Sequence, residues 1–271
     1  MSNDALGDRI KAYEKDWENR LMPFVPAIAR FDGKAFHTFT RGLNRPYDER
    51  LSDLMVQATR YMVRTNGACI GYTQSDEITL IWLVDDPKSE MFFGGRMQKM
   101  VSVLPAQLSV YFNSLLPDML PEKAGTFPVF DCRVFSVPTR TEAANVLVWR
   151  ELDATRNSIS MAAQSVYSHK QLMNKSCDVM QEMLFQKGIN WNDYPAFFKR
   201  GTYIQKKKAE RPFTTDELDK LPEKHEARTN PHLRVLRTDY AVVDMPPITK
   251  VVNREAVIFE GQLPQTDGDQ G

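Results

Sequence analysis

Three carboxylates stand beside the most apolar segments of this 271-residue chain. Asp32 lies in the segment RFDGKAFHTFT, which comes directly after the apolar stretch LMPFVPAIA. Asp76 and Glu77 lie in YTQSDEITLIW and directly precede its apolar run. Carboxylates that lie close together repel one another unless a positive group lies between them. Their placement therefore predicts a bound cation or a positive partner.

A divalent cation is the simplest partner for such a site. Mg²⁺ binds hard oxygen ligands, usually one or two carboxylates together with substrate phosphates. Gly33 adds a backbone carbonyl that can come close because glycine has no side chain. Two Mg²⁺ ions would serve phosphoryl transfer by holding the attacking and the leaving oxygen. A plainer interpretation is also open, in which Asp32 begins a turn and Asp76 caps a hairpin.

Basic residues near glycines are candidates for phosphate binding. Arg96 and Lys99 follow two glycines at the predicted start of a helix, and helix N-termini favour anions. Lys199 and Arg200 precede a glycine and, further on, three consecutive lysines. Both groups are also typical of a solvated surface. His37, five residues after Asp32, fits either a contact with a base or phosphate or a histidine of the core.

Several other chemistries lack their motifs. The four histidines show neither HxxxH nor HExxH spacing, and no GxxxxGK[ST], GxGxxG or GxSxG sequence occurs. A histidine zinc site and a P-loop nucleotide site are therefore not expected. Ser75 has no histidine placed for a catalytic triad. With 35 basic and 35 acidic residues, a phosphate-binding surface has to come from local basic clusters.

Hydrophobic periodicity predicts the elements that position these residues. Strands are expected at 24–31, 68–74, 77–84 and 127–138, and helices at 4–20, 45–67, 95–116, 141–169 and 170–187. The order β-α-β-β-α-β predicts an α+β, ferredoxin-like fold, an antiparallel sheet with helices on one face. In this topology the end of the first strand lies beside the turn between the second and third. Asp32 is therefore expected close to Asp76 and Glu77.

The same set of motifs resembles the tRNA-His guanylyltransferase family. RFDGKAFHTFT, NRPYDERLSDLM, QSDEITLIW, GRMQKM, FDCRVFSVP, VWRELDATRNSI and KRGTYI occur in the order and rough spacing of that family, over about residues 22–205. The resemblance implies a polymerase-like palm domain, which agrees with the βαββαβ order. It implies addition of nucleotides to the 5′ end of tRNA in the 3′-to-5′ direction. It also implies a homotetramer.

The resemblance implies a role for each matching position. Asp32 and Asp76 match the metal-binding aspartates, the Gly33 carbonyl is a further ligand, and Glu77 is the neighbouring catalytic acid. Expected at the nucleotide are Lys34, Phe36, His37, Arg45 (where the family usually has lysine), Ser75, Arg96 and Lys99. Expected at the RNA are Arg133, Asn157, Lys199 and Arg200. The implied cofactor is Mg²⁺, as two ions, and the implied substrates are ATP, GTP and other nucleoside triphosphates.

The sequence departs from the family at one motif. Members that act on tRNA-His carry HINNLYN after WRxxD, whereas the matching stretch here is TRNSISM, in which Thr155 replaces the histidine and Asn157 is kept. This departure resembles the guanylyltransferase-like branch, which extends 5′-truncated tRNA by copying the opposite strand. We predict that template-dependent repair. Alternatives are a tRNA-His-specific enzyme that adds one guanosine, a palm enzyme acting on small nucleotides, and an RNA-binding module without turnover.

The chain is expected to have three parts. These are a catalytic palm domain at 1–138, a helical region with a basic strand at 139–205, and an appendage at 206–271. Residues 204–232 have the composition of a charged loop, before a short pair of strands and a disordered tail from residue 262. Three scattered cysteines, no apolar leader and no long apolar run predict a cytoplasmic protein without a signal peptide or membrane span.

Overall fold

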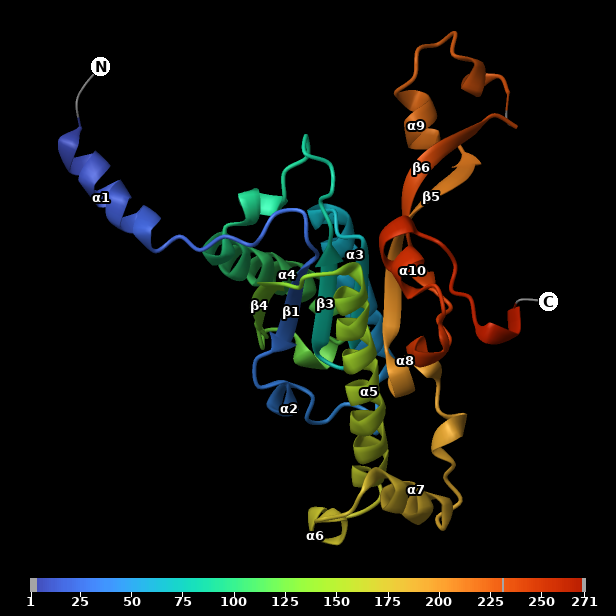
Figure 1. Cartoon of the computed structure of the whole chain (residues 1–271). Helices are drawn as coiled ribbons and strands as arrows, with labels where there is room; N and C mark the ends of the chain where they lie inside the picture. Colours follow the sequence, from blue (N-terminus) through green and yellow to red (C-terminus); the bar gives the residue numbers. More distant parts are fainter. Residues whose placement is uncertain (1–3, 231, 270–271) are drawn as a thin grey trace.

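A single antiparallel sheet organises the chain (Figure 1). The structure is a computed structural model that describes residues 4–230 and 232–269. The strands are β1 (Ala27–Gly33), β2 (Ile70–Gln74), β3 (Glu77–Trp82), β4 (Phe130–Ser136), β5 (Thr202–Pro212) and β6 (Arg234–Val243). The helices are α1 (Ala5–Asp16), α2 (Phe36–Phe39), α3 (Glu49–Asn66), α4 (Met97–Met119), α5 (Arg140–Gln164), α6 (His169–Leu172), α7 (Cys177–Phe185), α8 (Ala196–Arg200), α9 (Thr215–Asp219) and α10 (Arg254–Glu260).

The first part of the chain has the predicted topology. β1, α3, β2, β3, α4 and β4 follow one another in the order β-α-β-β-α-β, and the strands lie in the order β4-β1-β3-β2-β5-β6 with antiparallel pairing throughout. The α+β class and the palm-like sheet are confirmed. The long helix α3 forms because Asp48 caps its first turn and Gly67, at φ 66°, ends it in the left-handed conformation that glycine adopts without strain.

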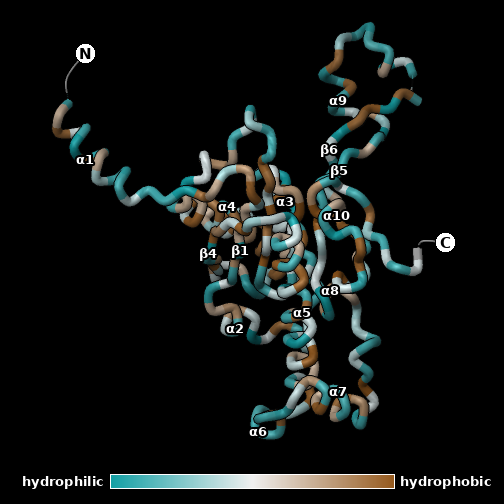
Figure 2. The backbone as a smooth tube through the Cα atoms, in the orientation of Figure 1, coloured by the Kyte–Doolittle hydropathy of each residue, from teal (hydrophilic) through white to brown (hydrophobic). Residues whose placement is uncertain are grey.

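Both faces of the sheet are covered. Side chains alternate between the faces of a strand, so Phe31, Ile78 and Leu80 pack with α3 and α4 on one face. Ile28 and Ile81 point to the other face and pack with α5 and α10. The two crossover helices thus lie on one face as predicted, and α5 and α10 add a second layer that the sequence pattern did not assign. Figure 2 shows apolar segments gathered along this sandwich.

The C-terminal third differs from the expected charged loop. β5 crosses the boundary drawn at residue 205, pairs with β2 through Gln205, and continues to Pro212 paired with β6. The two strands form a long hairpin that projects from the body (Figure 1). In the tail, Thr266 forms an antiparallel β-bridge with Val251. The last two positions of the predicted disordered tail, 270–271, lie outside the described residues.

A third, smaller core supports the end of α5. Leu172, Leu184 and Phe198 from α6, α7 and α8 pack with Ala162 and Ala163 of α5. This packing places α8 beside β2, where the hydroxyl of Tyr72 donates a hydrogen bond to the Arg200 carbonyl at 2.9 Å. No helix of the described chain is both long and apolar enough to cross a membrane.

Candidate active site

A cavity of about 600 Å³ opens at the end of β1 where Gly33 leads into α2. Its walls come from the loop around α2, the first turns of α3, the β2–β3 turn, the last turn of α5, and α8. Seven of the residues chosen from the sequence line it: Asp32, Gly33, Phe36, His37, Arg45, Ser75 and Asp76. The fold therefore brings the acidic motif and part of the nucleotide motif to one place.

Strand register sets the positions of the acids. Asp32 lies directly opposite Glu77 of β3 and, on its other side, opposite Asp131 of β4. These three residues form one cross-strand row on the face that α5 partly covers, while Asp76 belongs to the β2–β3 turn. Ser75 turns the chain there with φ 54°, a conformation that non-glycine residues rarely adopt. The predicted meeting of Asp32 with Asp76 and Glu77 is confirmed.

The Asp76 carboxylate has no basic partner among the described residues. Burial raises its pKa above the ordinary value, and the nearby charge of Asp32 raises it further, while a hydrogen bond from the Ser75 hydroxyl acts in the opposite direction. In the described part of the chain, neither Asp76 nor Asp32 forms an ion pair. A half-buried pair of like charges costs free energy that a bound cation would recover.

Glu77 is in a different electrostatic environment. Its carboxylate forms an ion pair with Arg150 of α5, whose side chain is only 5% exposed and also contacts Asp153 at 3.2 Å. The Arg150 guanidinium lies over the ring of Trp149, 4.5 Å from its centroid. Burial raises the pKa of Glu77, and Arg150 lowers it. Arg150 therefore neutralises Glu77 and holds it as part of the α5–sheet contact.

The residues at this end fit a hard divalent cation. Asp32 and Asp76 offer two carboxylates, the set that Mg²⁺ uses when phosphates complete its coordination. Within residues 4–230 and 232–269, no cluster of three or more His, Cys, Asp or Glu side chains forms a ready-made metal site. Gly33 is required by packing, because a Cβ there would lie 2.3 Å from the Phe36 ring.

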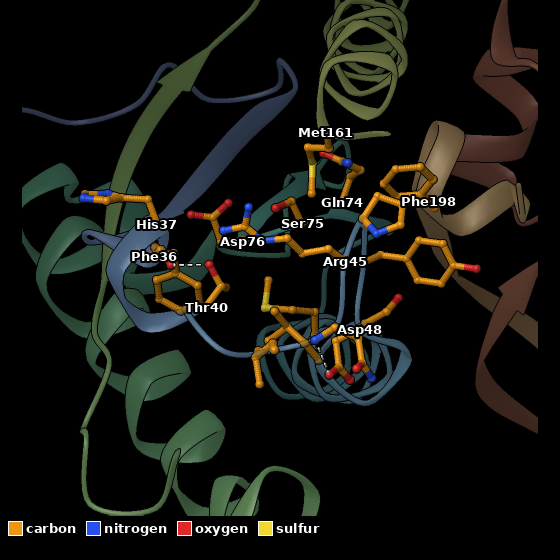
Figure 3. A pocket seen from close by; sticks show the side chains of 18 of the residues that line it. Phe36, His37, Thr40, Arg45, Asp48, Gln74, Ser75, Asp76, Met161 and Phe198 are labelled. Atoms are coloured by element: carbon orange, nitrogen blue, oxygen red, sulfur yellow. Dashed lines mark hydrogen bonds between the residues drawn. The ribbon is translucent and has the colours of Figure 1, made fainter. Parts of the chain in front are cut away.

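The cavity also offers a cation for phosphate. The Arg45 side chain extends across it toward Asp76, as Figure 3 shows. His37 points away from Asp76 in the same view. The loop that carries Arg45 is fixed by Asp48, whose carboxylate accepts hydrogen bonds from the Asn44 and Arg50 amides and from the Arg50 guanidinium. Those bonds, led by that from the Arg50 side chain, lower the pKa of Asp48 and keep it charged.

Arg96 and Lys99 lie at the opposite end of β1. The amide of Leu21, which precedes β1, donates a hydrogen bond to the Gly95 carbonyl. Arg20 and Arg96 form an isolated antiparallel β-bridge through their backbones. Arg96 lines a second cavity of about 640 Å³ with Arg20, and its guanidinium is 4.0 Å from the Glu18 carboxylate. Within one chain, Arg96 and Lys99 are thus separated from Asp32 and Asp76 by the length of strand β1.

The remaining predicted residues surround the acidic end without lining the cavity. Lys34 is exposed beyond the end of β1, and Arg133 is exposed on β4, two residues beyond Asp131. Asn157 donates a hydrogen bond to Asp153. Lys199 donates to the Asn192 carbonyl and lies over the Trp191 ring, and Arg200 follows on α8.

Some site residues escaped the sequence analysis. Tyr47, Gln74, Gln164 and Ser165 line the cavity, and Arg150 holds Glu77. Arg150 stood inside the recognised WRxxD motif, which was the only available signal. The others become neighbours only through the loop after α2 and the course of α5, which no local pattern records.

Known proteins resemble this chain in sequence and in fold. A family model described as tRNAHis guanylyltransferase matches residues 7–138. A tRNA(His) guanylyltransferase of Kluyveromyces lactis is 30% identical over 206 residues, 69% of this chain and 85% of that protein.

The chain belongs to the tRNA(His) guanylyltransferase family.

Other proteins resemble this chain over a larger share of its length. An uncharacterized protein of Acanthamoeba polyphaga mimivirus is 31% identical over 227 residues, 75% of this chain and 78% of that protein. A bacterial tRNA(His) guanylyltransferase (Thg1)-like protein in complex with ATP has a TM-score of 0.76 and 33% identity, over 93% of this chain and 96% of that one. A bacterial Thg1-like protein in complex with GTP gives a TM-score of 0.70 at 31% identity, over 91% and 95%. The predicted family is confirmed, and the protein is a guanylyltransferase-like nucleotidyltransferase.

Proposed function

We propose that this protein adds nucleotides to the 5′ end of tRNA in the 3′-to-5′ direction and that it repairs 5′-truncated tRNA by copying the opposite strand. The observation that carries the proposal is the pair Asp32 and Asp76, two carboxylates that form no ion pair in the described part of the chain and that lie beside a cavity of about 600 Å³. A nucleoside triphosphate has the charge and the size that such a site suits.

Asp32 and Asp76, with the Gly33 carbonyl, would hold Mg²⁺, as the motif match implies. When bound, Mg²⁺ supplies charge neutralisation at phosphate oxygens and lowers the pKa of a coordinated hydroxyl. Arg45, which extends toward Asp76, binds phosphate oxygens of the nucleotide. The Ser75 hydroxyl, hydrogen-bonded to Asp76, helps to orient that carboxylate.

The chemistry requires an activated 5′ end. A 5′-monophosphate has no good leaving group, so the end either receives AMP from ATP or starts as a triphosphate. The 3′-hydroxyl of the incoming nucleotide attacks the 5′ α-phosphorus, the new phosphodiester forms, and AMP or pyrophosphate leaves. No side-chain nucleophile takes part, and most of the acceleration comes from positioning and charge neutralisation.

The surface around the cavity supports a nucleic-acid substrate. Arg133 and Arg30 are opposite each other on β4 and β1, one row beyond Asp131 and Asp32 on the same face. Arg30 lies over the exposed ring of Trp149, 5.3 Å from its centroid. Basic side chains with an exposed aromatic ring are typical of surfaces that bind single-stranded ends.

Template-dependent repair is proposed over guanosine addition because α5 carries TRNSISM in place of HINNLYN. The last part of α5 reaches the cavity through Met161 and Gln164, so a changed motif on this helix lies close enough to alter substrate selection. The description of the matching family model favours the second candidate, addition of a single guanosine to tRNA-His. The likeness of nearly the full chain to bacterial Thg1-like proteins supports the first.

A labelled tRNA that lacks its first nucleotide separates the two candidates. It is supplied with a 5′-mono- or triphosphate, Mg²⁺, and each nucleoside triphosphate in turn, against template strands that differ at the opposite base. Repair predicts that the added nucleotide follows the opposite base. Addition of guanosine whatever the opposite base supports the tRNA-His activity instead. Consumption of free nucleotides without extension of any RNA would overturn both.

A further inference from the structure

Helix α5 has a charged residue where its pattern calls for an apolar one. Leu147 and Ala154 belong to the core between α5, α10 and the sheet. Position 151 lies four residues after the first and three before the second, which places all three on one face of the helix. The residue there is Glu151, whose exposed fraction is only 4%. A polar side chain buried in this way is more informative than a buried apolar one.

Both oxygens of the Glu151 carboxylate accept a hydrogen bond. The hydroxyl of Tyr203 donates to one oxygen at 2.7 Å, and the backbone amide of Ile248 donates to the other at 2.8 Å. In the described chain no basic side chain forms an ion pair with Glu151. Burial raises the pKa of Glu151, and the two hydrogen bonds act in the opposite direction. A carboxylate in such surroundings costs free energy unless its hydrogen bonds are kept.

These two bonds join α5 to segments that follow it in the chain. Tyr203 belongs to β5, and Ile248 lies in the segment 245–262, which contains α10 and packs against α5. Gln205 of β5 holds the same segment by a separate contact, because its side-chain amide donates to the carbonyls of Val257 and Gln262 at 2.8 and 2.7 Å. Those two bonds do not involve α5. The chain thus offers two buried polar contacts to this segment, of which Glu151 supplies the one from α5.

The same turn of α5 also holds the acidic end of the sheet. Arg150, the residue before Glu151, forms the ion pair with Glu77. Successive residues of a helix point about 100° apart, so one turn of α5 reaches β3 on one side and β5 on another. Glu77 directly follows Asp76 of the β2–β3 turn. A rotation of α5 about its axis would therefore displace this turn.

We propose that Glu151 is a positioning residue for nucleotide transfer. It fixes the rotation of α5, so that Arg150 holds the β2–β3 turn and its Asp76 carboxylate in the geometry that the reaction needs. This inference rests on the function proposed above. Glu151 touches neither the cavity nor the reacting groups, and its effect reaches them through its neighbour on the helix.

A second chain of contacts leads from the same point to the opposite wall of the cavity. The ring of Tyr203 packs against that of Tyr72, with 4.9 Å between their centroids. The hydroxyl of Tyr72 donates to the carbonyl of Arg200 at the end of α8, and α8 lines the cavity. The partners of Glu151 therefore support the site from both sides.

The test compares four variants. Glu151→Leu fits the apolar pattern and removes both hydrogen bonds. Glu151→Gln can keep both, because its oxygen can accept from the Ile248 amide and its NH₂ group can donate to the Tyr203 hydroxyl. Tyr203→Phe removes one bond and keeps the ring, so it tests the proposal even if Glu151→Leu does not fold. Gln205→Leu is the matched control, since it removes buried hydrogen bonds to the same C-terminal segment but none to α5.

Three quantities are measured for each variant: steady-state kinetics on a 5′-truncated tRNA, hydrogen exchange of residues 73–78, and stability in urea. Glu151→Leu, Tyr203→Phe and Gln205→Leu are all expected to lose stability, because each leaves buried polar groups unpaired. Only Glu151→Leu, and Tyr203→Phe to a smaller extent, are expected to change the site. For Glu151→Leu we expect kcat to fall about tenfold, since a displacement of about 1 Å can cost about a hundredfold.

The other kinetic and exchange results follow from the same geometry. KM for the nucleotide should change little, because Arg45 lies on a loop that Asp48 holds. Amides of the β2–β3 turn should exchange faster in Glu151→Leu and Tyr203→Phe. Glu151→Gln and Gln205→Leu should match the wild type in kcat and in the exchange of this turn.

Three results overturn the proposal. If Gln205→Leu lowers kcat as much as Glu151→Leu, the loss follows from stability alone. If Glu151→Gln loses as much as Glu151→Leu, the charge matters and the pair of hydrogen bonds does not. If the turn exchanges at the wild-type rate in Glu151→Leu, Glu151 does not act on the acidic end. A wild type that transfers no nucleotide to any RNA contradicts the proposed function instead, and the exchange of the turn then decides the role of Glu151.

Discussion

At the Gly33 end of β1, Asp32 and Asp76 face a cavity and form no ion pair with any described residue, whereas at the Ala27 end Arg20 and Arg96 share the carboxylate of Glu18. Both ends border a cavity of similar volume. Within the described chain, the two carboxylates of the acidic end form no ion pair, whereas Glu18 offsets part of the charge of the two arginines at the other end. A charge that the fold does not neutralise is costly unless a ligand neutralises it, and on this ground we propose that the acidic end holds a cation together with phosphates.

A second contrast lies within the acidic end itself. Asp76 and Glu77 are adjacent in sequence, yet Glu77 forms an ion pair with Arg150 and Asp76 forms none among the residues that the structure describes. We therefore propose that Asp76 serves the reaction and that Glu77 serves chiefly the contact between the sheet and α5.

Asp76→Asn is expected to have the largest effect. Losing a metal-holding carboxylate should reduce nucleotide transfer on the order of a thousandfold, since such charge stabilisation is worth several kcal/mol. Asp131→Asn is the matched control, because Asp131 lies opposite Asp32 but is exposed and near Arg133. Single-turnover rates on a 5′-truncated tRNA give the comparison. Equal losses in the two variants would show that Asp76 and Asp131 both act only through general charge.

Arg150→Met tests the pairing of Glu77. It leaves a largely buried carboxylate without its partner and should lower the free energy of unfolding by about 3 kcal/mol. Arg156→Met is the control, since Arg156 also pairs with Asp153 but is exposed, and its change should stay within about 0.5 kcal/mol. Urea denaturation measures both. A stability of Arg150→Met close to that of the wild type would refute the structural role assigned to Glu77.

Arg45→Ala tests the cation of the cavity. Loss of charge-assisted contacts with phosphate, about 1.5–3 kcal/mol, should raise KM for the nucleotide about ten- to hundredfold, with a smaller change in kcat. Arg45→Lys keeps a positive charge and should retain most of the affinity. Steady-state kinetics with a saturating tRNA separates the two parameters. If alanine and lysine behave alike, Arg45 does not bind the nucleotide through its charge.

The smallest expected effect is a gain in stability. Burial and Asp32 raise the pKa of Asp76 in the folded protein, so its charged form opposes folding. Asp76→Asn should therefore raise the free energy of unfolding in Mg²⁺-free buffer, on the order of 1 kcal/mol as for other favourable substitutions.

The sign of this effect follows from the direction of the pKa shift. A raised folded-state pKa means that the wild type loses stability as pH rises from the ordinary value of 3.8 through the raised value. The advantage of the variant should be full at neutral pH and should shrink as pH falls toward 3.8. Denaturation at several pH values measures it, and an advantage that grows with falling pH contradicts the assignment.

The sequence was informative where periodicity and local turns decide the structure. The βαββαβ order and the approach of Asp32 to Asp76 followed from apolar runs and turn residues. The same topology was enough to predict that Arg96 lies far from the acids. β3 runs antiparallel to β1, so its last residue lies next to the start of β1, and the segment that leads into α4 follows there. Only the resemblance of motifs placed Arg96 and the acids in one predicted site.

The hairpin of β5 and β6 could not be read from hydrophobic pattern. From Lys206 to Pro212 the side chains alternate between exposed and half-buried, and the strand is held by pairing with β6. Backbone hydrogen bonds form with any side chain, so a charged strand of this kind has the composition of a loop. The role of Arg150 was likewise invisible, because it depends on how α5 crosses the sheet.

The most direct test of the account is a titration with Mn²⁺, followed by electron paramagnetic resonance, of the wild type, Asp76→Asn and Asp131→Asn. Mn²⁺ stands in for Mg²⁺ because both prefer carboxylate and water oxygens. The account predicts that the wild type and Asp131→Asn bind the ion with similar affinity and that Asp76→Asn loses this binding. Equal binding by all three proteins would contradict the assignment of Asp32 and Asp76 as the metal site.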